Sequence, residues 1–106
     1  MNIREKYIRR GIRTASRIYK DKTVVILLSL GNMDRKSYGL AILEDEGTLL
    51  WRLLDENRRV KEVVNTIAKF KKISYARIGG RLLAYIKKLA KYHIVDIIDS
   101  PSDEYY

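Results

Sequence analysis

The stretch of residues 38–64 constrains the fold more than any other part of the chain. It begins with an apolar run typical of a strand, and Glu44-Asp45-Glu46 then open a short helix that carries the only tryptophan, Trp51. A polar break at residues 55–59 separates this helix from a second one, in which apolar residues recur at helical spacing. This order predicts an α+β domain whose core is built from the Leu, Val and Trp side chains of the stretch.

A β-hairpin is predicted before the first helix. Residues 23–30 (T-V-V-I-L-L-S-L) have the length and β-branched content of a strand, and both faces of that strand are apolar and need a cover. Residues 31–36 form a polar loop, and residues 37–43 return as the second strand. With so few strands we expect an open sheet edge unless another segment pairs with it.

The N-terminal segment, residues 1–22, is the most basic part of the chain. At 100° per residue its apolar side chains gather on one side of a helix and its basic side chains on the other, which predicts an amphipathic helix with Gly11 as a weak point. A strand over residues 13–19 is the alternative interpretation.

Three helices are expected in the remainder, over residues 45–55, 60–70 and 74–91. Consecutive carboxylates at the start of the first helix are typical of helix caps, so we expect no metal site there. Residues 94–98 are either a third strand or extended chain packed on the core. Residues 99–106 form an acidic tail, which we expect to be disordered and to follow a single domain over residues 23–98.

Charge and composition indicate the class of partner. The formal net charge is +9, which favours nucleic acid, an acidic peptide or an anionic membrane surface. The chain has no cysteine and no glutamine, which fits a cytoplasmic protein under thermal selection, and no signal peptide is expected at its N-terminus. The longest apolar run is too short to span a bilayer.

The inventory of reactive side chains argues against an enzyme. Acid–base and nucleophilic catalysis require a positioned nucleophile with a base, or paired carboxylates. The chain has one histidine and no cysteine, and it contains no phosphate-binding loop, dinucleotide fingerprint or zinc spacing. We therefore expect no catalytic residues and no cofactor.

The last expected helix carries two stripes at helical spacing. One is apolar and faces the core. The other interleaves basic and tyrosine side chains: Arg77, Arg81, Tyr85, Lys88 and Tyr92. Such a face suits a phosphate backbone or an acidic peptide.

Residues 41–64 resemble the signature of the PqqD-like proteins. These are peptide chaperones of pyrroloquinoline quinone biosynthesis, and their fold is also the recognition element of many ribosomally made, post-translationally modified peptides. Leu49-Leu50-Trp51 is similar to the apolar-apolar-Trp of that family, and Leu54-Asp55 with Val63-Val64 is similar to its continuation. Glu56 stands where the family usually has glycine.

The resemblance implies a winged-helix-like domain, with a small antiparallel sheet on three helices. It also implies a chaperone without catalytic activity, which binds a precursor (leader) peptide as an added strand on the sheet edge and presents it to a radical S-adenosylmethionine-type modifying enzyme. The implied peptide-binding residues are Tyr38, Leu40, Ile42, Arg77, Arg81, Tyr85 and Lys88.

Two further hypotheses remain open. A winged-helix DNA-binding protein would insert the last helix into the major groove and contact phosphates with the basic N-terminal segment. Its binding residues would be Arg9, Arg10, Arg13, Arg17, Arg77, Arg81, Lys87 and Lys88. The other hypothesis is a homodimer formed through the doubly apolar strand at residues 23–30.

Overall fold

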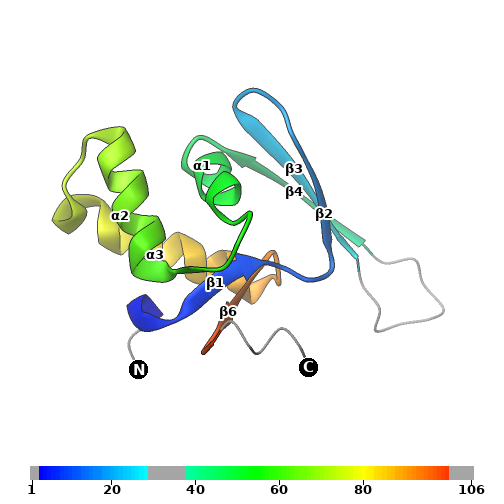
Figure 1. Cartoon of the computed structure of the whole chain (residues 1–106). Helices are drawn as coiled ribbons and strands as arrows, with labels where there is room; N and C mark the ends of the chain where they lie inside the picture. The colour runs from blue at the N-terminus through cyan, green and yellow to red at the C-terminus, as the bar shows by residue number, and fades with distance from the viewer. Residues whose placement is uncertain (1–2, 29–37, 101–106) are drawn as a thin grey trace.

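The computed structural model describes residues 3–28 and 38–100, and in these ranges the fold is α+β with three helices and two antiparallel three-stranded sheets (Figure 1). The helices are α1 (Glu46–Leu53), α2 (Val60–Lys71) and α3 (Tyr75–Lys91). They confirm the three helices expected from the sequence, with ends that differ by at most two residues. The arrangement is compatible with the expected winged-helix-like class, although it contains two small sheets where one was expected.

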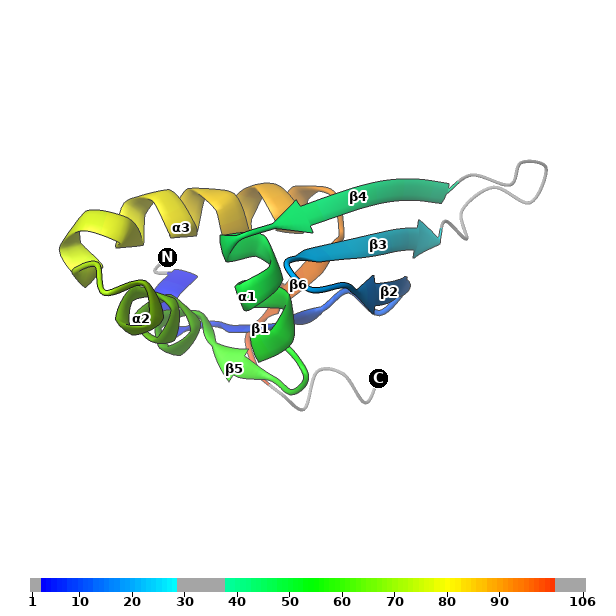
Figure 2. The same ribbon diagram turned by 90° about the horizontal axis from the view of Figure 1, so that it is seen from above.

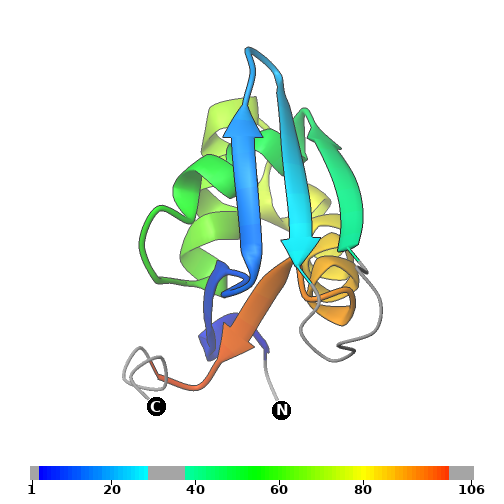
Figure 3. The ribbon, with the colours of Figure 1, turned by 90° about the vertical axis from the view of Figure 1, so that its right-hand side faces the viewer.

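The first sheet is an antiparallel meander in the order β2 (Thr14–Ile18), β3 (Lys22–Leu28) and β4 (Tyr38–Glu44). It contains the predicted hairpin. Thr23 lies opposite Leu43 in the register, and both are buried against the helices. Figure 3 shows the three strands in front of the helices, so that one face of this sheet packs on the helical layer and the other faces away from it.

The second sheet places β1 (Tyr7–Arg10) between β5 (Arg58–Arg59) and β6 (Val95–Ile98). Ile8 of β1 is fully buried in the core. For residues 94–98 the sequence allowed a strand or extended chain, and the structure has the strand, β6. The two-residue β5 was not expected.

The predicted amphipathic helix over residues 1–22 is wrong. Beyond a short 3-10 turn at Ile3–Glu5, this segment forms β1 and β2, and the alternative strand at residues 13–19 is confirmed as β2. The change of sheet occurs at Gly11, whose N–H donates to the carbonyl oxygen of Ile94 at 2.9 Å. A side chain there would overlap the carbonyl oxygen of His93. Strand pairing with distant segments therefore outweighs the local helical pattern.

Trp51 of α1 joins the two sheets. Its side chain is fully buried, and its indole N–H donates to Oγ of Ser16 in β2 at 2.9 Å. Arg10 of β1 lies over the indole ring, with Cζ 5.0 Å from the centroid, and donates through Nη2 to the Trp51 carbonyl oxygen at 2.8 Å. The ring and backbone of one residue thus hold β1, β2 and α1 together.

Thr48 fixes the start of α1 to the first sheet. Its buried hydroxyl accepts from Oγ1 of Thr23 at 3.1 Å and shares its one hydrogen between the carbonyl oxygens of Leu43 and Asp21, at 3.0 and 3.2 Å. These contacts place α1 directly at the end of β4.

Some expected features fall outside the described residues: the whole of the loop expected at residues 31–36, and the tail from residue 101 on. Asp99, which we assigned to the tail, is described and forms an ion pair with Lys6. No helix within the described ranges is long and apolar enough to cross a membrane.

Candidate functional site

β4 is an edge strand of the first sheet. All seven of its residues pair with β3, and within the described part of the chain no other strand pairs with it. The N–H and C=O groups that alternate along its other side are therefore available to an added strand. The open edge expected from the sequence is present.

The two faces of β4 differ in their exposure and in the size of most of their side chains. Leu43 and Ala41 point inward, toward the core, with Gly39 on the same side. Leu40 and Ile42 point outward and are 64% and 58% exposed. These two predicted peptide-binding residues therefore lie on the outer face of the sheet and not in a groove beside the helix, because successive side chains alternate across a strand. Tyr38, a third predicted residue, begins the strand.

α3 lies on the same side of the molecule as β4 and runs in the opposite chain direction (Figure 2). The two elements are linked where β4 passes into α1. There Arg81 of α3 donates to Oε2 of Glu46 at 2.7 Å, and the Tyr85 hydroxyl approaches Gly47 so closely that an added Cβ would lie 2.5 Å from it. Gly47 is therefore required for this approach.

A surface hollow of about 320 Å³ lies at this junction. It is lined by Glu44, Asp45, Glu46, Gly47, Arg81 and Tyr85. Two of the predicted peptide-binding residues, Arg81 and Tyr85, thus meet the end of the open edge strand in one place.

The carboxylates at the start of α1 make ion pairs instead of the helix caps that we expected. Asp45 occupies the N-cap position with φ of 54° and makes no side-chain capping bond. Its Oδ1 accepts from Nζ of Lys71 at 2.9 Å. Glu46 lies between Arg81 and Lys71, whose Nζ is 3.7 Å from its Oε2. The reason is that α2 and α3 bring cations to this point, which the local sequence does not show.

Two pKa shifts follow from this arrangement. Burial raises the pKa of the Tyr85 phenol, and the Glu46 carboxylate raises it further. The hydrogen bond with Asp45 raises the pKa of the Lys71 ammonium group, although burial opposes it. At neutral pH the hollow therefore contains a neutral phenol, which can donate or accept a hydrogen bond, beside paired charges.

Arg77 and Lys88 extend this face of α3 in both directions. Both are exposed, and at 100° per residue they lie on the same side of the helix as Arg81. The four helical residues predicted to bind a peptide thus share one face, and two of them, Arg81 and Tyr85, bring that face to the end of β4.

The residues proposed for DNA do not form one surface. Arg77, Arg81, Lys87 and Lys88 are exposed on α3, which lies on the side of β4 (Figure 2), whereas Arg13 and Arg17 are exposed at or beside β2, the opposite edge of the sheet. Arg9 pairs with Asp96 at 3.5 Å. Arg10 is engaged with Trp51, and burial lowers the pKa of its guanidinium group while Asp55 raises it. The structure therefore does not bring the N-terminal and helical groups together.

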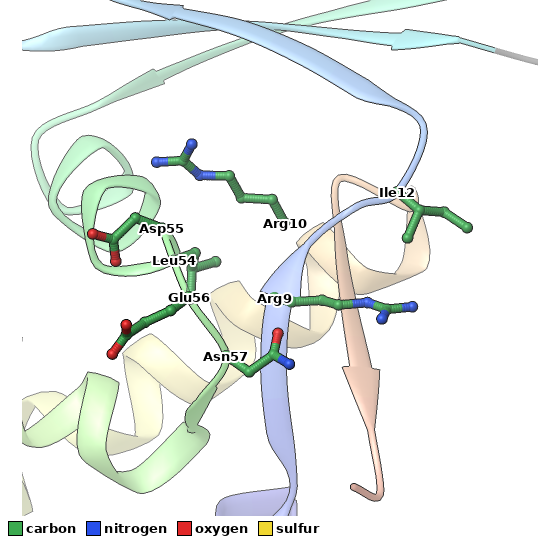
Figure 4. Close-up of a pocket in the computed structure, with 7 residues that line it drawn as sticks. All are labelled: Arg9, Arg10, Ile12, Leu54, Asp55, Glu56 and Asn57. Atoms are coloured by element: carbon green, nitrogen blue, oxygen red, sulfur yellow. The ribbon is translucent and has the colours of Figure 1, made fainter. Parts of the chain in front are cut away.

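A second hollow, of about 630 Å³, was not predicted from the sequence. Figure 4 shows its lining residues: Arg9, Arg10, Ile12, Leu54, Asp55, Glu56 and Asn57. Arg10 extends toward the side of Asp55, while Arg9 extends the other way from β1 (Figure 4). Because two carboxylates stand against two guanidinium groups, the hollow favours neither sign of charge. It arises from the β1–β5 pairing, for which the sequence gives no local signal.

A third, mainly apolar hollow of about 150 Å³ lies between α1 and α2, beside the exposed side chain of Phe70. Within residues 3–28 and 38–100, no group of three or more His, Cys, Asp or Glu side chains could hold a metal ion.

Comparison with known proteins returned no match to any family model, any curated protein or any solved structure. The PqqD-like resemblance of residues 41–64 therefore stays a hypothesis, and the function must be argued from the edge strand and its surroundings.

Proposed function

We propose that this chain is a non-enzymatic peptide-binding module, which receives a precursor (leader) peptide as an added strand on β4. The observation that carries the proposal is the open edge of β4, seven residues long, with Arg81 and Tyr85 of α3 at its end. An extended peptide that pairs along this edge gains backbone hydrogen bonds, each with a net contribution of about 1 kcal/mol. Side chains of α3 and of the sheet then determine which peptide is preferred.

Charge argues that the edge receives a foreign strand and not the β4 of a second copy. Two β4 strands paired about a two-fold axis would place two α3 helices on the same face of a joint sheet. Their exposed basic side chains, among them Arg81 and Lys88, would then repel each other across the pair. A strand that brings acidic side chains to this position meets no such repulsion.

The role of the bound peptide is a proposal that rests on the resemblance of residues 41–64. The module would hold the peptide for a radical S-adenosylmethionine-type modifying enzyme in the cytoplasm, and it would need no cofactor of its own. The chain supplies binding and orientation in this scheme, and the partner enzyme supplies the chemistry.

A winged-helix DNA-binding role is the second candidate, because α3 exposes five basic residues along its 17-residue length: the four predicted ones, Arg77, Arg81, Lys87 and Lys88, and also Lys91. This role makes a different prediction about salt. Binding to duplex DNA should weaken steeply as salt rises, with a slope set by the number of phosphates contacted.

The test is a titration of ¹⁵N-labelled protein with short peptides encoded beside its gene, followed by amide chemical shifts. We expect the largest shifts in residues 38–44 and at Arg81 and Tyr85. Shifts that leave 38–44 unchanged would refute strand addition at this edge. In parallel, a fluorescent DNA duplex at about 50 mM salt tests the second candidate, and saturable binding with a steep salt slope would favour it.

A further inference from the structure

We infer that the peptide received by β4 alternates apolar and acidic side chains, with the acidic ones directed toward α3. This inference rests on the proposed function and adds the chemistry of the bound strand. It follows from the different surroundings of the two faces of the edge.

The outer face requires apolar side chains. Leu40 and Ile42 are mostly exposed there, and Ile26, opposite Leu40 in the register, is 37% exposed. An added strand would place its own outward side chains about 4.5–5.5 Å from those of β4, Cβ to Cβ. Valine, isoleucine or threonine at these positions of the peptide would cover the exposed apolar side chains of Leu40 and Ile42.

The inner side of the edge is open because its residues are small. Gly39 and Ala41 supply this side before Leu43 enters the core, and an added Cβ at Gly39 would meet nothing closer than Cβ of Leu27, at 3.9 Å. An inward side chain of the peptide therefore has room to extend past β4 toward α3.

The side chains that it would meet there are basic. Arg81 is 62% exposed even though it pairs with Glu46. Lys88 is exposed two turns further along the same face, and within the described residues no ion pair neutralises it. An inward carboxylate thus gains attraction along this face, and an inward lysine meets repulsion.

Spacing indicates how far apart the acidic residues lie. Arg81 and Lys88 are separated by about 10.5 Å along the helix axis at 1.5 Å per residue. Same-face positions of an extended strand repeat at about 6.7 Å and 13 Å. Because all these side chains are long, we expect two acidic residues in the peptide that are two or four positions apart.

The experiment uses three synthetic peptides, acetylated and amidated, followed by amide shifts of the full chain. The first, T-E-V-E-V-E-T, has the inferred pattern. The second, T-K-V-K-V-K-T, keeps the alternation and reverses the charge. The third, T-V-V-E-E-E-T, keeps the composition of the first and removes the alternation.

We expect the first peptide to bind with shifts in residues 38–44, and about tenfold more tightly than either of the others at low salt. Lys88→Glu should reduce the preference for the first peptide over the second severalfold. Lys69→Glu, an equal change of net charge at an exposed position of α2, should leave that preference unchanged.

The other outcomes separate the inference from the function on which it rests. Equal affinity for the first and second peptides, with shifts in 38–44, would overturn the acidic pattern and leave strand addition standing. Equal affinity for the first and third would overturn the alternation alone. Shifts confined to α3, or no shifts with any peptide, would overturn strand addition at this edge and the inference with it.

Discussion

Replacing Gly11 with alanine gives stability changes of opposite sign for the two structures that the N-terminal segment allows. In the interior of an amphipathic helix the substitution would stabilise the protein by about 1 kcal/mol. In the structure, the new Cβ would overlap the carbonyl oxygen of His93 and lie 3.0 Å from that of Ile94. Both are backbone atoms at the entrance to β6, so relief requires a shift of the chain.

Such overpacking costs about 1–3 kcal/mol, and weakening the Gly11–Ile94 hydrogen bond adds about 1 kcal/mol. We therefore expect Gly11→Ala to reduce the free energy of unfolding by about 3 kcal/mol. For a domain of this size, that lowers Tm by about 12 °C. Urea unfolding and thermal unfolding, both followed by far-UV circular dichroism, measure the change.

The matched control is Gly80→Ala in the interior of α3. An added Cβ there meets no atom within 4 Å, so alanine should stabilise the protein by about 1 kcal/mol. If Gly11→Ala were as stable as the parent chain, or more so, the β1–β2 crossing at Gly11 would be refuted. The amphipathic helix predicted for residues 1–22 would then be the better description of the segment.

Two further predictions concern Trp51 and Tyr85. Ser16→Ala removes the acceptor of the buried Trp51 indole N–H and should lower the free energy of unfolding by about 1–3 kcal/mol. Urea unfolding, followed by the fluorescence of this single tryptophan, measures the change. Unchanged stability would contradict the hydrogen bond. The raised pKa of Tyr85 means that the fold favours the neutral phenol, so its contribution to stability is present below its ordinary value of 10.0 and is lost as pH rises through the higher value in the folded protein. Tyr85→Phe should therefore lose less stability than the parent between about pH 9 and 12, and equal losses would show that Tyr85 does not titrate in this way.

The elements that the sequence predicts are those whose signal is local. In α2 the residues Val60, Val63, Val64 and Ile67 recur at helical spacing, and all of them are buried. The β3–β4 hairpin is likewise indicated by two neighbouring runs of strand-forming residues. In these segments the periodicity of apolar residues and the tertiary packing favour the same structure, so the periodicity alone is enough to predict it.

β1 and β5 could not be predicted, because each forms by pairing with a segment that lies far away in the sequence. Tyr7 pairs with both Arg59 and Ile98, and these partners lie far along the chain. Among the basic side chains that suggested a solvated helix face, Arg10 packs on Trp51 in the fold, whereas Arg13 and Arg17 are exposed at or beside β2. The amphipathic pattern of the segment therefore did not predict the structure that forms.

Part of the candidate site could have been predicted from the sequence. Once Leu43 is assigned to the core, alternation along the strand directs Leu40 and Ile42 to the outer face, so their placement could have been inferred. The link from Glu46 to Arg81 could not, because it depends on how α3 lies against α1. Gly47 gives one hint in retrospect: a glycine in the first turn of a helix marks a close neighbour, here the Tyr85 hydroxyl.

An open edge beside exposed apolar side chains is normally a hazard, because two copies can join through it. Under the proposed function, the protection against self-pairing and the selectivity for a partner would have the same physical origin. The basic face of α3, with Arg81 and Lys88, would oppose a second β4 that brings its own α3, and it would attract a strand with inward carboxylates. Charge reversal on this face should therefore change both properties together: Lys88→Glu should weaken the preference for the acidic peptide and also lower the barrier to self-association. A variant that loses the preference but stays monomeric at high concentration would show that the two effects have separate causes.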